Sequence, residues 1–341
     1  MSPPVEGLWP IFTYIDLFAG IGGFHLAADA LGGKCLFASE VDPEARRAYE
    51  ANYGLHPHGD ITRIPSGGIP DHDALFAGFP CQPFSIIGSR LGFEDTRGTL
   101  FFEIARIIRE KETKPRLLVL ENVKQLAGHE KGKTLATILA TLSDLGYKAH
   151  WRVLNALDFG LPQKRERTII IGFRDRGVSF CFPTGTGPGN LADVLESDSE
   201  VDQRFLASDR IVKKRLERHA SHHFPGIWHE NKSGNISSYP YSCALRAHAS
   251  YNYLLVNGRR RLTPREMLRL QGFPDSFRIV CNDTQTRKQA GNAVPVNMIK
   301  AVLKEALEAW GQSPGRPAGT VPTPGPPEFE VACGANPGSG A

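Results

Sequence analysis

The stretch DLFAGIGGFHLA, residues 16–27, decides the fold class of this 341-residue chain. The apolar run Tyr14–Phe18 predicts a buried strand, and the residues after the glycines predict a helix. Three glycines lie between the two, where the turn exposes backbone N–H groups and lets a ligand approach closely. The stretch is not the dinucleotide fingerprint G-x-G-x-x-G, because His25 stands where the third glycine is required.

Short apolar runs alternate with helical patterns through the first half of the chain. LLVLENV (117–123) and TIIIGF (168–173) predict buried strands, whereas residues 99–110 and 134–146 place apolar side chains at helical spacing. Strands separated by amphipathic helices are typical of βαβ units. The sequence therefore predicts an α/β fold with a doubly wound, mostly parallel sheet.

The pattern breaks near Phe182, where FPTGTGPGN is turn-rich and typical of a linker. Helical spacing returns only with TPREMLRLQGF and with VNMIKAVLKEALEAW near the end. We therefore expect a discontinuous catalytic domain of residues 12–183 and 286–312, and a smaller domain of residues 184–285. Residues 313–341 are rich in proline and glycine, and we expect a disordered tail there.

Composition excludes several classes of protein. The net charge of +4 permits a nucleic-acid partner. None of the six cysteines forms a C-x-x-C pair, so we expect no structural zinc site. The sequence has no apolar run long enough for a membrane span and no secretory signal at its start. We therefore expect a cytoplasmic protein without a membrane partner.

Two acidic residues strengthen the prediction of a nucleotide site at the glycine turn. Glu40 ends the second apolar run, about 20 residues after the turn, where an acid accepts hydrogen bonds from ribose hydroxyls. Asp60, in GDI, ends a possible third strand, where a carboxylate can accept a hydrogen bond from an adenine amine. Together they indicate an adenosine-bearing cofactor and leave open a nicotinamide, a nucleotide or a methyl donor.

Cys81 lies in GFPCQPFS (78–85), directly after another apolar run. Pro80 and Pro83 restrict the backbone around its thiol, and ligands of open α/β sheets bind at this carboxyl edge. Glu121 ends the next strand, and QKRER supplies two arginines before TIIIGF. A held thiol beside an acid and guanidinium groups indicates a nucleophile rather than a core cysteine.

The sequence resembles the cytosine-C5 DNA methyltransferases, of the bacterial restriction–modification type, over nearly all of residues 12–310. The segments that carry the resemblance follow the family order: DLFAGIGGF, the acid Glu40, GDI, GFPCQPFS, RGTLFFEIARII, ENV, QKRER, RLTPREMLRLQGFPDSF and QAGNAVPVNM.

The resemblance implies a methyl transfer from S-adenosylmethionine, leaving S-adenosylhomocysteine, without a metal. It implies that the Cys81 thiolate adds to cytosine C6 while Glu121 interacts with N3. Arg165 would hold the base near O2, and Arg167 belongs to the same catalytic set. The implied cofactor residues are Phe18, Gly20, Gly23, Glu40, Asp60, Ile61, Pro80, Leu100 and Asn292.

The implied substrate is double-stranded DNA, whose target base must leave the stack to reach a thiol. The smaller domain would read the sequence, and the enzyme is expected to act as a monomer. Ala244 stands where family members often carry threonine, so the contact made by that threonine is not carried over to this chain. The expected DNA-binding residues are Gln82, Ser85, Lys213, Lys214, Arg215, Leu245 and Arg246.

Three other functions compete with DNA methylation. A tRNA cytosine-C5 methyltransferase shares the catalytic residues, but such relatives tend to have proline where Phe79 stands. An NAD-binding oxidoreductase would use the glycine turn and Glu40, and would leave Cys81 and Glu121 unexplained. A non-catalytic DNA-binding regulator would keep the fold but should lose the nucleophile, which is present.

Overall fold

The computed structural model describes residues 12–80, 100–221, 223–231, 233–247 and 249–311. The predicted nucleophile Cys81, its neighbours Gln82 and Ser85, and the tail at 313–341 lie outside the described residues.

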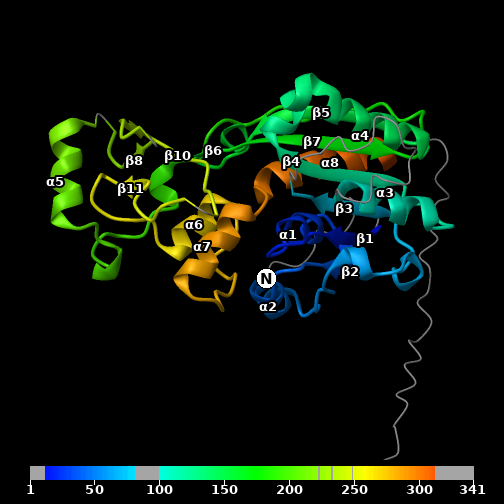
Figure 1. Cartoon of the computed structure of the whole chain (residues 1–341), viewed down its shortest axis with the longest axis horizontal. Coiled ribbons are helices and arrows are strands. Elements are labelled where there is room, and N and C mark those ends of the chain that lie inside the picture. Colours follow the sequence, from blue (N-terminus) through cyan, green and yellow to red (C-terminus); the bar gives the residue numbers. More distant parts are fainter. Residues whose placement is uncertain (1–11, 81–99, 222, 232, 248, 312–341) are drawn as a thin grey trace, which may run out of the picture.

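The main sheet of the described residues has six strands in the order β2-β1-β3-β4-β7-β5 (Figure 1). Its strands are β1 Phe12–Leu17, β2 Gly33–Ser39, β3 Ala74–Gly78, β4 Leu117–Val123, β5 Lys148–Asn155 and β7 Glu166–Phe173. β1 to β4 pair in parallel, and β7 runs antiparallel to both β4 and β5. The predicted α/β fold with a mostly parallel sheet is confirmed.

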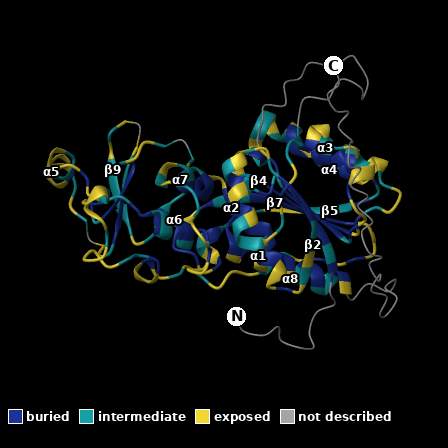
Figure 2. Cartoon of the chain, turned by 90° about the horizontal axis from the view of Figure 1, so that it is seen from below, coloured by how far each residue is buried: buried dark blue, intermediate teal, exposed yellow. Residues whose placement is uncertain are grey.

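Helices cover both faces of this sheet, as a doubly wound fold requires (Figure 1). They are α1 Gly23–Asp29, α2 Pro43–Tyr53, α3 Leu100–Glu110, α4 Lys133–Asp144 and α8 Val296–Gly311. Alternate strand residues face opposite sides, so Val119 packs in the cluster that includes α1 and α8, while Leu118 packs in the cluster that includes α3 and α4. Figure 2 shows the strands buried between these layers. The last helix therefore returns to the first domain.

A smaller group of elements lies to one side of the main sheet (Figure 1). Its elements are α5 Asp209–Arg218, β8 Ile227–Glu230, β9 Ile236–Tyr239, β11 Leu254–Val256, α6 Pro264–Leu270 and α7 Asp283–Asn292. The strands form a sheet in the order β11-β8-β9. β10 Ser242–Cys243 pairs in parallel with β6 Gln163–Lys164, which joins this group to the strand before β7. The expected boundary at residue 285 falls inside α7, and the division into domains remains a prediction.

The possible third strand ending at Asp60 is not a strand. One bridge pairs His58 with Ser39, and Asp60 then caps the 3₁₀ helix Ile61–Arg63. The Asp60 carboxylate accepts a hydrogen bond from the backbone N–H of Thr62 (3.0 Å), and this bond begins the helical turn that ends the extended backbone.

In the described part of the chain, no helix has the length and apolar character needed to cross a membrane.

Candidate active site

The glycine turn holds its backbone in the left-handed region at Phe18, Gly20 and Gly22, with φ of 57°, 56° and 82°. Glu40 stabilises this turn, because its carboxylate accepts hydrogen bonds from the N–H groups of Gly20 and Asp42, each at 2.8 Å. A methyl group added to Gly20 would meet no atom within 4 Å. The turn therefore presents open backbone beside an acid.

A cavity of about 360 Å³, here called the central cavity, lies at the carboxyl ends of β1 to β4. Its wall brings together residues that the sequence analysis predicted for two separate tasks. These are Phe18, Gly20, Glu40, Pro80, Leu100 and Asn292 for the cofactor, and Glu121, Arg165 and Arg167 for catalysis.

Three predicted cofactor residues do not line this wall. A Cβ added to Gly23 would lie 2.6 Å from Cγ2 of Val294, so Gly23 permits the close approach of α1 to the segment before α8. The Asp60 carboxylate accepts hydrogen bonds from the hydroxyl and the N–H of Thr62 (2.8 and 3.0 Å), and these bonds lower the pKa of Asp60. Ile61 is buried, with 3% of its surface exposed.

Glu121 forms an ion pair with Arg167, whose Nε lies 2.7 Å from Oε1. Both side chains are largely buried. Asn122 fixes the adjoining backbone by donating to the carbonyl of Phe79 at 2.8 Å. This bond holds Pro80, the residue before Cys81, close to the end of β4.

Arg165 has a different environment. Its guanidinium donates to three backbone carbonyls, those of Leu245 (2.9 Å), Gly291 (3.0 Å) and Ala293 (2.8 Å). Burial, and then the charge of Arg167, lower the pKa of Arg165 to about 9. These three bonds anchor Arg165 to the backbone, and the expectation that it holds the base near O2 stays a prediction. Arg167 is the arginine that pairs with Glu121.

Sequence reasoning missed two further features of the site. Gln163 holds the Leu245 backbone by accepting from its N–H (3.0 Å), and its amide donates to the carbonyl of Leu270 (2.8 Å). Asp42 and Lys288 form an ion pair at 2.7 Å, and both line the central cavity. Lys288 directly precedes the motif QAGNAVPVNM and lies one helical turn before its Asn292. This position was the sequence signal that could have indicated a role for the lysine.

The expected DNA contacts on α5 are only partly supported. Arg215 is buried and forms an ion pair with Glu230 (3.1 Å), so its guanidinium is held inside the fold, and its contact with a phosphate stays a prediction. Lys213 and Lys214 are both exposed, and Lys214 lies near Glu230, at 3.6 Å. α5 lies at the end of the smaller group away from the main sheet (Figure 1).

The predicted residues Leu245 and Arg246 lie next to Arg165. The Leu245 side chain is buried, so its backbone serves as an anchor. Arg246 is exposed and stacks on Tyr253, with 4.8 Å between its Cζ and the ring centroid. The described residues contain no group of three or more side chains arranged to hold a metal ion.

The carboxyl edge of this doubly wound sheet carries the glycine turn, Glu40 and the Glu121–Arg167 ion pair. This combination is typical of the α/β methyltransferases. The chain belongs to the C-5 cytosine-specific DNA methylase family, because the model of that family matches residues 12–308. The chain is therefore a DNA cytosine-5 methyltransferase.

The chain is similar to type II methyltransferases over most of their length. It is 54% identical to the type II methyltransferase M.NgoBI of Neisseria gonorrhoeae, over 86% of this chain and 92% of that protein. It is 54% identical to M.HaeII of Haemophilus aegyptius (87% and 93% covered) and 43% identical to M.HhaI of Haemophilus parahaemolyticus (85% and 92% covered). The S. pombe Dnmt2 methyltransferase structure shares the fold, with a TM-score of 0.68 at 18% identity, over 88% of this chain and 99% of that chain.

Proposed function

We propose that this enzyme methylates C5 of one cytosine in a short specific sequence of duplex DNA, with Cys81 as the nucleophile. The observation that carries this proposal is the Glu121–Arg167 ion pair in the wall of the central cavity. That wall also includes Pro80, one residue before the cysteine.

The central cavity fits S-adenosylmethionine. Gly20 leaves space for close approach, and the Glu40 carboxylate still has lone pairs to accept ribose hydroxyls. Phe18, Leu100 and Asn292 would complete the pocket. When bound, this cofactor supplies an electrophilic methyl group, and S-adenosylhomocysteine is the product. The proposed reaction needs no metal.

Cysteine attack is needed because cytosine C5 is a weak nucleophile. A bond from the Cys81 sulfur to C6 moves the electrons of the C5–C6 double bond toward C5. Glu121 in its protonated form donates a hydrogen bond to N3 and passes a proton to it as negative charge builds on the ring. After C5 has gained the methyl group, a base removes the C5 proton, the sulfur leaves, and N3 returns its proton to Glu121, which restores the ring.

We assign Arg167 to the base and Arg165 to the backbone around it. Arg167 keeps Glu121 in one orientation and has further N–H donors that can reach the base near O2. Arg165 and Gln163 position the segment at Leu245 against the central cavity. The target base must swing out of the duplex, and contacts from the smaller domain offset that cost.

Labelled methyl donor and plasmid DNA test the reaction, and bisulfite sequencing identifies the modified cytosine. Cys81→Ala should abolish transfer while donor binding is retained. A duplex with 5-fluorocytosine at the modified position should become covalently linked to the wild-type enzyme. Label found only in tRNA would favour the alternative tRNA methyltransferase, and full activity of Cys81→Ala would refute the nucleophile assignment.

The type II names of the relatives support a role in protecting host DNA from a restriction endonuclease. Plasmid from an expressing host should then resist an endonuclease that cuts the methylated sequence. We expect a monomer acting on DNA in the cytoplasm, which light scattering and cell fractionation can test.

A further inference from the structure

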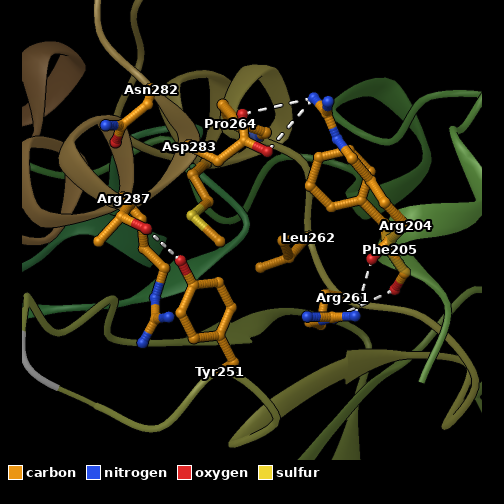
Figure 3. A pocket seen from close by; sticks show the side chains of 11 residues that line it. Arg204, Phe205, Tyr251, Arg261, Leu262, Pro264, Asn282, Asp283 and Arg287 are labelled. Carbon is orange, nitrogen blue, oxygen red and sulfur yellow. Dashed lines mark hydrogen bonds and ion pairs between the residues drawn. The ribbon is translucent and has the colours of Figure 1, made fainter. Parts of the chain in front are cut away.

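A second cavity, of about 460 Å³, lies in the smaller group of elements beside α6 and α7 (Figure 3). We call it the Tyr251 cavity. Leu262 and Met267 are buried and form an apolar floor. Arg204, Arg261 and Arg287 stand in its wall against one carboxylate, Asp283. The wall is therefore cationic around an apolar floor.

Tyr251 lies between two of these arginines (Figure 3). The Cζ atom of Arg287 lies 4.1 Å from its ring centroid, and that of Arg261 lies 5.8 Å away. The Tyr251 hydroxyl is held by Thr284 on α7, at 2.5 Å. Tyr251 remains 45% exposed, so a ligand can reach this stack.

The charges of Arg261 and Arg287 are not neutralised within the described part of the protein. Arg204 pairs with Asp283 at 3.2 Å, which accounts for the only carboxylate in the wall. Arg261 donates to backbone carbonyls, at 2.7 Å to Arg204 and 2.9 Å to Leu206. Arg287 donates to the carbonyl of Ala249. Both guanidinium groups are thus held by backbone carbonyls, and neither forms an ion pair with a described carboxylate.

The Tyr251 cavity is separate from the central cavity. A small space of about 10 Å³ beside it shares Tyr251 and Arg287 and is also lined by Leu245 and Arg246. Helix α7 spans the interval between the two cavities, since Thr284 lines the Tyr251 cavity and Gly291 lines the central cavity. Seven residues of α-helix cover about 10 Å. Successive nucleotides of one strand rise by about 3.4 Å, so the two cavities are separated by about three nucleotides.

We propose that the Tyr251 cavity binds a phosphodiester group of the DNA substrate, about three nucleotides from the flipped cytosine. This inference rests on the proposed action on duplex DNA. The guanidinium groups of Arg261 and Arg287 bind the phosphate oxygens, and the Tyr251 ring between them keeps the two groups in place. The phosphate supplies the negative charge that the described residues do not supply.

The phosphate site in the Tyr251 cavity is additional to the exposed Lys213 on α5. The positive charges of Lys214 and Arg215 on α5 lie beside Glu230, whereas Arg261 and Arg287 have no carboxylate partner among the described residues. A phosphate gains most from guanidinium groups that are already fixed and unpaired, because little side-chain freedom is lost on binding.

The test measures the salt dependence of binding of a duplex oligonucleotide that contains the methylated sequence. Each phosphate contact contributes about 0.9 to the slope of log K against log salt concentration. Arg287→Gln should lower that slope by about 0.9, and Arg287→Lys, which keeps the charge, should lower it by much less. Lys304→Gln, which removes an exposed positive charge on α8 that is paired with Glu308, is the control and should leave the slope unchanged. An unchanged slope in Arg287→Gln would overturn the proposal.

A second measurement locates the phosphate and guards against a folding defect. Single neutral methylphosphonate links are placed along the duplex, and the one that weakens wild-type binding most should have no further effect on Arg287→Gln. S-adenosylmethionine binding by the variant should equal that of the wild type. Additive effects of Arg287→Gln and every link would refute the site. If the wild type neither binds nor methylates duplex DNA, the proposed function fails instead.

Discussion

The ammonium group of Lys288 lies 2.7 Å from the carboxylate of Asp42, although the two residues are 246 positions apart in the chain. Asp42 follows the acid that holds the glycine turn, and it caps α2 by accepting from the N–H of Glu44. Lys288 lies on α7, one turn before Asn292. The pair therefore ties the cofactor turn to α7 at the wall of the central cavity.

Lys288→Met should weaken the binding of S-adenosylmethionine without removing a catalytic group. A partly exposed ion pair contributes up to about 1 kcal/mol, so we expect the KM for the donor to rise about three- to fivefold at unchanged kcat. Initial rates at saturating DNA measure both constants. Lys304→Met, which removes the outer pair with Glu308 on α8, is the control. An unchanged KM would show that the pair does not shape the cavity.

The same pair predicts a pH dependence of stability. Burial opposes ionisation of Asp42, but hydrogen bonds from Lys288 and backbone N–H groups outweigh it and hold its pKa below 3.8. A lowered carboxylate pKa gives stability that is complete above pH 3.8 and is lost as the pH falls through the folded-state value. The Tm difference between wild type and Lys288→Met should therefore be constant from about pH 5 to 8 and shrink at lower pH. Calorimetry that finds a difference growing on acidification would contradict this sign.

Glu121→Gln and Arg167→Lys should each reduce methyl transfer by about 100-fold or more, because each disturbs the group that stabilises charge on the ring. Lysine keeps the charge of Arg167 but loses its planar fork. Single-turnover rates give the loss, and donor binding should be unaffected. Glu166→Gln removes the neighbouring exposed pair with Lys124 (2.8 Å) and should retain nearly full activity. Equal losses in all three variants would point to a folding effect.

Gln163→Leu should separate DNA binding from donor binding. The substitution leaves the N–H of Leu245 and the carbonyl of Leu270 without their side-chain partner in a fully buried site. An unsatisfied buried group costs about 1–3 kcal/mol, so we expect lower stability and weaker DNA binding. Urea unfolding and oligonucleotide titration measure the two effects, with donor binding as the reference. Tight DNA binding by this variant would exclude the positioning role.

Gly23→Ala should destabilise the fold by about 1–3 kcal/mol through overpacking. Its added methyl group would lie 2.6 Å from Val294 Cγ2, so α1 must move away from the segment before α8. Gly128→Ala is the control, since a methyl group there meets no atom within 4 Å. Urea midpoints of the two variants should differ clearly, and equal midpoints would show that α1 can shift without cost.

Local sequence patterns were sufficient for β1, β4, β7, α3 and α4 of the main sheet and its helices, but not for α2 or β5, which the sequence analysis did not predict. Consecutive residues such as Leu118 and Val119 are both apolar because helices cover both faces of β4. The continuous apolar run that results can be recognised in the sequence. Asp60 could not be placed in this way, because one hydrogen bond to Thr62 turned an extended segment into a 3₁₀ helix.

By itself the sequence determined the doubly wound sheet, the edge of the sheet that carries the chemistry, and the family, because all three depend on residue types at short spacing. Only the tertiary structure decided what each arginine does. Arg165 and Arg167 are two positions apart, yet one binds backbone carbonyls and the other pairs with Glu121. Arg215 forms an ion pair with Glu230, while Arg261 and Arg287 lie over the ring of Tyr251. The partner of a charged side chain comes from a distant part of the chain, and only folding determines which part that is.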